Sequence, residues 1–363
     1  GVPLGGLVGF STRFHSQASS ETMVHYMTDG VFLRLLSENP DLAGVDCVVV
    51  DEFHERRVSM DVSVGILKKI RGRRRDLMAV VLSATMDGRR VADFLGGEFL
   101  DLGASAVRET KGGSVVHNGL YPVRVYYRGG ASIPDVLEEI ERRDPGGTGG
   151  VLVFLPGKPE IDRAWDEIEE AFPGRYAIYP LHGDLDLPEQ ELALNPPSDG
   201  RRPVILSTNV AETSVTPNGI FYVIDSGLEK VAESRPLSFS TLEIAWISRA
   251  SAIQRAGRVG RIGPGVAYRL YSREEYESFA ENRDPEILRA DISDILLRLY
   301  DIGLPGLDEI PLLDSPDEER VREAQTLLED LGAVRGGQIT PLGRRMARLP
   351  MEPRLSRMVI EAV

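Results

Sequence analysis

Short apolar runs that end in polar residues recur along the chain, separated by segments with helical spacing. One run covers residues 45–50 and breaks off into Asp51 and Glu52, and another covers 76–82 and ends in Ser83. Apolar, β-branched runs of this length are typical of parallel strands that are covered on both faces. We therefore expect two buried strands here, each placing polar side chains at its carboxyl end.

A second series of strands and helices follows residue 120. Strands are predicted within 121–127, 151–156, 176–185, 203–209 and 219–227, with helices between them. This alternation predicts a second parallel sheet. The stretch between the two α/β blocks is rich in Gly and Ser, and we interpret it as a linker or an exposed hairpin.

After residue 285 the pattern changes to short amphipathic helices. Ile292, Ile295, Leu296 and Leu299 fall on one apolar face, and a second such face lies within 321–331. A small hairpin and turn are predicted within residues 336–350. The spacing indicates a helical or winged-helix module.

Composition and charge exclude some classes of protein. The 363 residues are enough for two or three domains, and 42 Lys and Arg against 56 Asp and Glu give a net charge of −14. Such a balance argues against coating nucleic acid through bulk charge, although a local basic channel remains compatible with it. No signal peptide and no apolar stretch of about 18 residues, the length of a spanning helix, is visible.

The single cysteine, Cys47, lies inside the first apolar run. We expect it to be a buried structural thiol rather than a reactive one. With one cysteine no intrachain disulfide can form, which is compatible with a reducing cytoplasm. A cytoplasmic protein outside membranes is therefore expected.

Asp51 and Glu52 are the first candidate catalytic residues. Ligands of open α/β sheets bind at the carboxyl ends of the strands, where these two side chains are expected. There Asp51 could hold a divalent metal ion, and Glu52 could orient and deprotonate an attacking water. A solvated acidic turn explains the same residues equally well, so this stretch alone leaves both interpretations open.

The segment SAIQRAGRVGR (251–261) carries the second candidate group. On a helix, Gln254, Arg258 and Arg261 would project along one stripe. Two glycines between them would each cost about 1 kcal/mol in a helix interior relative to Ala, which predicts a close approach of another backbone or of a ligand. A merely basic, exposed face explains the arginines but not the glycines, so a binding function is favoured.

A third candidate site begins a helix. Thr28, Asp29 and Gly30 precede an apolar run with helical spacing, and Thr28 or Asp29 is predicted to cap that helix. The free amides of a helix start could also hold a phosphate of a bound strand. The residues by themselves do not decide whether capping is their whole function.

The ordered series TDG (28–30), DEFH (51–54), SAT (83–85), STNVAETSVT (207–216) and QRAGRVGR (254–261) resembles the motifs of the DEAH-box (DEAH/RHA) RNA helicases of superfamily 2. The likeness extends over essentially the whole chain. DEFHER and IDSGLEKV (224–231) are most similar to the bacterial HrpB-type branch of that family. The resemblance implies an α/β fold with two RecA-like parallel-sheet lobes, the first truncated at its N-terminus, followed by a small winged-helix and helical module.

The expected domains follow from this resemblance. They are a partial first lobe (1–108), a linker (109–120), a second lobe (121–275), a winged-helix domain (276–345) and the start of a ratchet domain (346–363).

The resemblance also implies which residues bind ATP and Mg²⁺. Asp51 would hold the metal, Glu52 would be the general base, and His54 would link the nucleotide site to the second lobe. Ser83 and Thr85 would couple hydrolysis to movement of the lobes. The residues expected on the nucleotide side of the second lobe are Gln254, near the γ-phosphate, Arg258 and Arg261, as arginine fingers, and Asp225.

For nucleic acid, the resemblance implies contacts along the phosphate backbone of one RNA strand. The residues concerned are Arg13, Thr28, Asp29 and Gly30 in the first lobe and Thr208 and Asn209 in the second. Residues near 228–247 are expected to form a hairpin that helps to separate strands. Backbone contacts do not distinguish RNA from DNA, and no protein partner is predicted.

The phosphate-binding loop of the family, G-x-x-x-x-G-K-[ST], does not occur in these residues. We therefore expect a fragment of an ATP-dependent RNA helicase, one that hydrolyses ATP poorly or not at all without that loop. A non-catalytic RNA- or protein-binding module with the same fold is the alternative. A viral DExH helicase is a third interpretation, against which the winged-helix tail argues.

Overall fold

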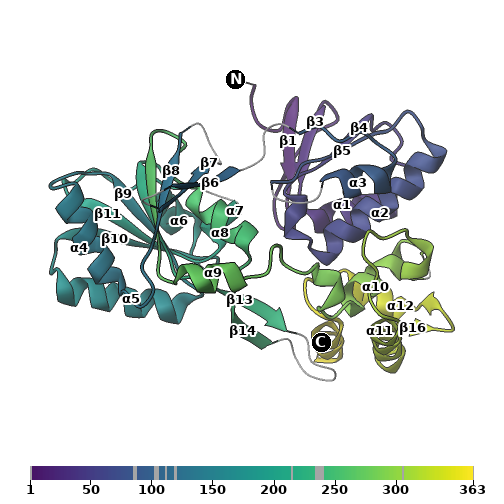
Figure 1. Ribbon diagram of the computed structural model, residues 1–363. Coiled ribbons are helices and arrows are strands. Elements are labelled where there is room, and N and C mark those ends of the chain that lie inside the picture. The colour runs from purple at the N-terminus through teal and green to yellow at the C-terminus, as the bar shows by residue number, and fades with distance from the viewer. Residues whose placement is uncertain are drawn as a thin grey trace.

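The computed structural model describes residues 2–84, 88–101, 106–110, 113–117, 121–213, 216–233, 241–304 and 306–362. Figure 1 shows two α/β blocks side by side, with the C-terminal helices packed beneath the first block. The α/β fold class, with a parallel RecA-like lobe and a C-terminal winged-helix region, is confirmed. Within the described ranges, no helix is long and apolar enough to cross a membrane.

The second lobe is built on an eight-stranded sheet in the order β10-β11-β9-β12-β15-β8-β7-β6. Its parallel strands are β8 (Val123–Tyr127), β9 (Gly150–Phe154), β10 (Tyr176–Leu181), β11 (Arg202–Ser207), β12 (Ile220–Asp225) and β15 (Gly265–Arg269). Its helices are α4 (Ile133–Arg143), α5 (Lys158–Ala171), α6 (Leu187–Leu194), α7 (Val210–Thr213), α8 (Arg249–Ala256) and α9 (Arg273–Ser278). Every residue of the central strand β9 is buried, as expected for a parallel strand covered on both faces.

The predicted linker is mostly part of this sheet. Strands β6 (Ala106–Thr110) and β7 (Gly113–His117) form an antiparallel hairpin, and β7 also pairs with β8. Of the two interpretations offered for the Gly- and Ser-rich stretch, the hairpin is therefore correct. The second sheet consequently begins before the expected boundary at residue 121, because β7 of the hairpin hydrogen-bonds to β8.

The first lobe has two small sheets. Strands β1 (Val8–Ser11), β2 (Ser16–Gln17) and β3 (Val24–Met27) form one, and β4 (Cys47–Val50) pairs in parallel with β5 (Met78–Val81) in the other. The helices of this lobe are α1 (Asp29–Glu38), the 3₁₀ helix η1 (Phe53–Glu55), α2 (Val58–Arg73) and α3 (Gly88–Leu95).

The prediction that β4 and β5 are buried strands is wrong, although the strands exist and are parallel. Cys47 is exposed, and Val49 on the same face of β4 retains 55% of its accessible surface. Successive side chains of a strand point to opposite faces, and only the face of Val48 and Val50 packs against the apolar core. The expectation that Cys47 is a buried thiol fails for the same reason.

The C-terminal module contains the predicted helices, and its hairpin begins at Val334, slightly before the predicted range of 336–350, which also contains a helix. Its elements are η2 (Glu286–Leu288), α10 (Ser293–Asp301), η3 (Leu307–Glu309), α11 (Glu318–Asp330), β16 (Val334–Arg335), β17 (Gln338–Ile339), α12 (Pro341–Ala347) and α13 (Pro353–Ala362). Gly336 and Gly337 join β16 to β17 with φ of +58° and +73°. Positive φ at both residues of a two-residue hairpin loop is the reason for glycine there.

This module and the first lobe share one hydrophobic core. Leu36 of α1 and Val62 of α2 belong to the same buried cluster as Leu296 of α10 and Leu328 of α11. Gly65 lies at the closest approach, because a Cβ there would be 2.3 Å from the carbonyl oxygen of Pro311. The C-terminal helices therefore complete the first lobe.

Polar contacts fix the same junction. Arg56, at the end of η1, donates to Asp61 of α2 over 2.8 Å and to Asp314 of the C-terminal module over 2.6 Å. The backbone amide of Glu286 donates to the carbonyl of Arg56 as well. The turn that follows Asp51 and Glu52 is thus tied directly to the module.

Candidate functional site

The segment after β4 turns sharply and presents its carboxylates outward. Glu52 and Arg56, at the two ends of η1, both have left-handed φ, +53° and +47°. Such values are strained for non-glycine residues and concentrate at functional sites. Phe53 between them is fully buried against Met60 and Val64, which anchors the turn.

The environment of Glu52 suits a general base. Partial burial raises the pKa of its carboxyl group above the usual value, the neighbouring Asp51 adds to this effect, and His54 opposes it. A carboxylate whose pKa is moved toward neutral accepts a proton more readily from water. Asp51 is exposed and accepts a hydrogen bond from the Glu52 amide over 2.8 Å, which leaves carboxylate oxygen free for a cation.

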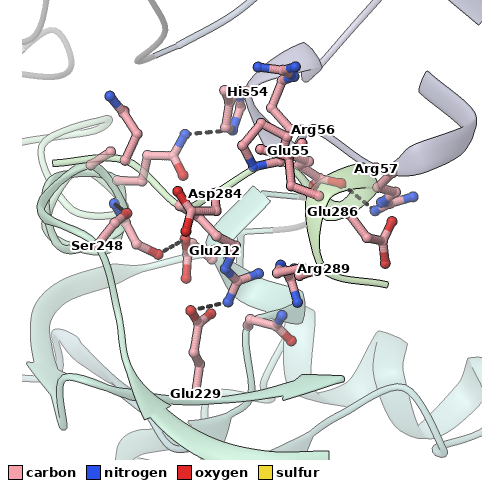
Figure 2. Close-up of a pocket in the computed structure, with 18 of the residues that line it drawn as sticks. His54, Glu55, Arg56, Arg57, Glu212, Glu229, Ser248, Asp284, Glu286 and Arg289 are labelled. Atoms are coloured by element: carbon pink, nitrogen blue, oxygen red, sulfur yellow. Dashed lines mark hydrogen bonds and ion pairs between the residues drawn. The ribbon is translucent and has the colours of Figure 1, made fainter. Parts of the chain in front are cut away.

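His54 connects the two lobes. Its Nδ1 accepts a hydrogen bond from the amide of Ala84 over 3.3 Å and lies 3.4 Å from Oε2 of Glu52. Its Nε2 lies 2.6 Å from the side-chain amide nitrogen of Gln254 on α8. Figure 2 shows this contact as a dashed line at His54. One imidazole thus touches the carboxylate turn, the SAT segment and the second lobe.

The SAT segment reaches His54 through its backbone. Ala84 makes the contact, whereas Ser83 is exposed just beyond β5. Thr85, the other predicted coupling residue, lies outside the described residues. The prediction that both hydroxyls couple hydrolysis to lobe movement therefore stays a prediction.

The prediction of one helical stripe for Gln254, Arg258 and Arg261 is wrong. Helix α8 ends at Ala256, and Gly257 is its C-cap, so both arginines lie beyond the helix. Gly260 has φ +83°, and a Cβ there would lie 2.7 Å from the carbonyl oxygen of Tyr121. The predicted close approach of another backbone is confirmed at this glycine, and the resulting turn, not a helix, sets the direction of the arginines.

Arg258 is a buried cation in this turn. Its Nη1 donates to Oγ1 of Thr216 over 2.9 Å, and among the described residues no carboxylate lies within ion-pair distance. Burial and the neighbouring Arg261 lower the pKa of Arg258 to about 10, so the side chain still carries its charge at pH 7. A buried guanidinium of this kind is suited to an incoming anion. Arg261 is exposed beside it.

The position of Asp225 does not fit the prediction that it contacts the nucleotide. It ends β12, is almost fully buried, and accepts hydrogen bonds from Arg255 over 2.8 Å and from the hydroxyl of Tyr271 over 2.9 Å. Both carboxylate oxygens are thereby engaged inside the lobe. This placement favours a structural function over direct contact with a nucleotide.

The residues predicted to bind nucleic acid in the first lobe lie just beyond the carboxyl ends of the parallel strands β1 and β3. Arg13 is exposed beyond β1, and Thr28 occupies the N-cap of α1 without a side-chain capping bond. The Asp29 carboxylate accepts from the amide of Gly30 and from the hydroxyl of Ser59 on α2. Thr28 is therefore the N-cap residue, as predicted, but its hydroxyl is exposed and makes no capping bond, whereas the Asp29 carboxylate binds the amide of Gly30 and the hydroxyl of Ser59.

In the second lobe, Thr208 and Asn209 follow β11. The Thr208 amide donates to the carbonyl of Leu181 over 3.1 Å, and Asn209 is exposed at the start of α7. Asn209 also lines a cleft of about 630 Å³ between the lobes and the C-terminal module, shown in Figure 2. His54 and Gln254 line the same cleft, so it adjoins the contact between the lobes.

Arg255 is a residue that the motif spacing did not single out. It is fully buried and pairs with Glu212 and Asp225. A sequence signal was present, because Ala252, Arg255, Ala256 and Val259 fall on one helical face and only Arg255 is charged. A lone charge on an apolar face indicates a buried ion pair.

Comparisons with known proteins agree with this architecture. The family model "Helicase conserved C-terminal domain" matches residues 133–263, and the winged-helix model "Helicase associated domain (HA2)" matches residues 324–351. The chain is 35% identical over 374 residues to the ATP-dependent RNA helicase HrpA of Escherichia coli, covering 99% of this chain and 28% of that protein.

Two further relatives have similar identities. The chain is 34% identical to the ATP-dependent RNA helicase HrpB of E. coli, covering 99% of this chain and 43% of that protein. It is 35% identical to the probable ATP-dependent RNA helicase DHR2 of Saccharomyces cerevisiae, covering 100% of this chain and 50% of that protein. The crystal structure of the E. coli DEAH/RHA helicase HrpB superposes with a TM-score of 0.82 at 33% identity, covering 99% of this chain and 45% of that one.

A parallel-sheet lobe, a second α/β lobe that meets it at His54 and Gln254, and a winged-helix module define a two-lobed helicase core. The chain contains a helicase conserved C-terminal domain and a winged-helix HA2 domain, and it is similar over its whole length to DEAH/RHA helicases. It spans between 28% and 50% of the length of the curated relatives described above. The identities to HrpA and HrpB differ by one percentage point, so they do not separate these two branches.

Proposed function

We propose that the protein carrying this chain is an ATP-dependent RNA helicase whose nucleotide site is divided between the two lobes. The contact between His54 and Gln254 carries this proposal, because it joins the DEFH turn to the QRAGRVGR segment across the lobes. Closure of the lobes would bring the carboxylates of Asp51 and Glu52 opposite the guanidinium of Arg258. ATP turnover would open and close this contact and so advance the protein along RNA.

Each group at this junction has a chemical function in the proposal. Glu52 takes the proton of the hydrolytic water, and Arg258 and Arg261 stabilise the charge that develops on the transferred phosphoryl group. Asp51 would hold Mg²⁺, which is commonly bound by one or two carboxylates together with phosphate oxygens. Within the described part of the chain no three metal-binding side chains converge, and a single exposed carboxylate fits this mode of binding.

RNA is the proposed polynucleotide. The names of the relatives support RNA, and Arg13, Thr28, Asp29 and Gly30 of the first lobe together with Asn209 and Thr208 of the second are proposed to contact its phosphates. Phosphate contacts set register and orientation without reading sequence. We also propose the cytoplasm as the location, because the one cysteine, Cys47, makes no intrachain disulfide.

We propose further that these residues alone turn over ATP slowly. The lysine and the hydroxyl of a phosphate-binding loop hold the β- and γ-phosphates and the metal in such enzymes. No segment of that pattern is present in the 363 residues. Full turnover would then require the loop in the same polypeptide.

The test is ATP hydrolysis by a protein that contains this chain together with its phosphate-binding loop, measured with single-stranded RNA and with DNA of the same sequence. RNA should raise the rate at least tenfold more than DNA does. ATP or RNA binding without any stimulated turnover would reject the enzyme and favour a non-catalytic binding module. Equal stimulation by DNA would reject the proposed preference for RNA.

A further inference from the structure

The side chain of Arg255 lies buried inside the second lobe. It is 0% exposed. Its Nε donates to Oε2 of Glu212 over 2.8 Å, and its Nη1 donates to Oδ1 of Asp225 over 2.8 Å and to the carbonyl of Leu228 over 3.2 Å. Its guanidinium also lies 5.0 Å from the ring centroid of Phe154. One side chain thus binds three separate segments.

Glu212 belongs to the segment with the proposed RNA contacts. It lies on α7, whose start carries Asn209, and the amide of Glu212 donates to the carbonyl of Asn209 over 2.9 Å. The other carboxylate oxygen of Glu212 accepts from the hydroxyl of Ser251 on α8. Glu212 therefore fixes this loop to the helix that carries Gln254.

Asp225 and Leu228 belong to the base of a hairpin. Strands β13 (Leu228–Glu233) and β14 (Thr241–Trp246) pair antiparallel, from Leu228 opposite Trp246 to Glu233 opposite Thr241. The predicted hairpin near 228–247 is thereby confirmed. In Figure 1 it projects from the second lobe toward the C-terminal module.

The base of this hairpin is held on both of its strands. The amide of Gly227 donates to Asp225 over 3.0 Å, and the amide of Ile247 donates to the carbonyl of Gly227 over 2.9 Å. Gly227 has φ +76°, and a Cβ there would lie 2.7 Å from the ring of Tyr271, whose hydroxyl binds Asp225. Substitution of this glycine would be strained and would also push Tyr271 away.

Beyond β14 the chain passes directly into α8. Ser248 caps that helix, since its hydroxyl accepts from the amide of Ser251 over 3.1 Å. The hairpin is therefore joined to α8 twice, through the chain at Ser248 and through the side chain of Arg255.

Stability alone does not explain the buried ion triad of Arg255, Glu212 and Asp225. Removing one member of a buried ion pair costs about 3–5 kcal/mol, yet an apolar replacement of the whole group is often neutral or stabilising. The two carboxylates raise the pKa of Arg255 although burial opposes them, so the charge is maintained. What the triad supplies is a fixed geometry between segments.

We propose that Arg255 is a positioning residue that holds α8, the loop of Asn209 and the base of the β13–β14 hairpin in one arrangement. A change at Gln254 on nucleotide binding would then move the hairpin with α8, and ATP turnover would be coupled to strand separation. This inference rests on the proposed helicase function.

The experiment uses the full helicase and measures ATP hydrolysis and unwinding of an RNA duplex in parallel, which gives base pairs opened per ATP. Arg255→Lys keeps the charge but cannot bind Glu212, Asp225 and Leu228 together. We expect base pairs opened per ATP to fall about tenfold. Arg258→Lys is the contrasting variant, since loss of an arginine finger should slow both reactions and preserve the ratio.

Tyr271→Phe is a milder variant that tests the same proposal if Arg255→Lys does not fold. It removes only the hydroxyl bound to Asp225, and we expect the ratio to fall about threefold. Tyr268→Phe is the matched control, because within the described residues the buried Tyr268 hydroxyl has no hydrogen-bond partner. That control should match wild type in both reactions.

An unchanged ratio in Arg255→Lys, or in Tyr271→Phe if the lysine variant does not fold, overturns the proposal. A wild-type protein that neither hydrolyses ATP nor unwinds RNA rejects the helicase function itself, before any variant is compared.

Discussion

The two lobes differ in how they bury their sheets. In the second lobe β9 is buried along its whole length within an eight-stranded sheet, whereas in the first lobe β4 is half-buried on alternate residues and exposed on the others, and among the described residues it pairs with β5 alone. The first lobe instead shares its core with the winged-helix module, through α1 and α2. The lobe that carries the candidate base therefore depends on a neighbouring module for its packing, and the second lobe does not.

The lobes also differ in the charges that they bring to their junction. The first lobe supplies the carboxylates of Asp51 and Glu52, and the second supplies the cations of Arg258 and Arg261. In the proposed mechanism the carboxylates would deprotonate a water and the cations would stabilise phosphoryl charge, so both lobes would be needed. We make separate predictions for the two lobes, and we expect substitutions at the junction to have the larger effects.

The largest effect is expected at the cation of the second lobe. Arg258→Lys should lower RNA-stimulated ATP turnover about 10³-fold in the intact protein, since arginine fingers contribute on the order of 10³–10⁵. Lysine keeps one charge but loses the planar fork that binds two phosphate oxygens. Steady-state turnover with saturating RNA measures this, and a loss below tenfold would remove Arg258 from the site.

The next largest effect is expected in the hydrophobic core that the first lobe shares with the C-terminal module. Leu296→Ala in α10 should cost about 2–5 kcal/mol of unfolding free energy, the range for a fully buried leucine. Because Leu296 lies in the core shared with α1 and α2, hydrogen exchange should increase in the first lobe and in the module together.

Leu152→Ala in β9 is the matched control for that substitution. Leu152 is equally buried, but in a core of the second lobe alone. In Leu152→Ala, hydrogen exchange should increase only in the second lobe. If Leu296→Ala left protection of α1 and α2 unchanged, the shared core would be refuted.

A pH dependence is expected at the junction of the first lobe and the module. Burial raises the pKa of Asp61 to about 6, even though Arg56 binds one of its oxygens. A carboxyl group that holds its proton more tightly in the folded state stabilises the fold at low pH. This stabilisation is complete below the unfolded pKa of 3.8 and disappears as the pH rises through 6. The shift corresponds to roughly 3 kcal/mol.

Asp61→Asn isolates this contribution, because asparagine does not titrate. Between pH 4 and pH 7, wild type should lose about 2–3 kcal/mol of unfolding free energy relative to the variant. Chemical denaturation at both pH values measures the difference. Parallel pH profiles for the two proteins would contradict the raised pKa.

The smallest effects compare two helix starts. Ser132 accepts from the amide of Asp135 in a capping box on α4, so Ser132→Ala should cost about 1 kcal/mol. Thr28 makes no capping bond at α1, so Thr28→Ala should cost less but weaken RNA binding severalfold. Thermal unfolding and RNA titration separate the two effects, and equal losses of stability would show that Thr28 is only a cap.

Sequence patterns predicted the order of strands and helices well because apolar periodicity depends on local burial. They failed where tertiary context decides, as in the exposure of Cys47 and in the pairing of the β6–β7 hairpin with a sheet formed by later residues. Motif order identified the residues of the junction, but helical spacing misplaced Arg258, because Gly257 ends α8. The partners of Asp225 and Arg255 lie far away in the chain, so no local spacing predicts them.

The most direct measurement is single-turnover ATP hydrolysis by Glu52→Gln in a protein that contains the phosphate-binding loop. Glutamine preserves the shape of Glu52 but cannot take a proton from water, so the rate should fall about 10²–10⁴-fold, the usual contribution of a general base. ATP affinity should stay within about threefold, because the metal and phosphate contacts remain with other groups. Hydrolysis within tenfold of wild type would show that the DEFH turn is an acidic surface turn and not half of an active site.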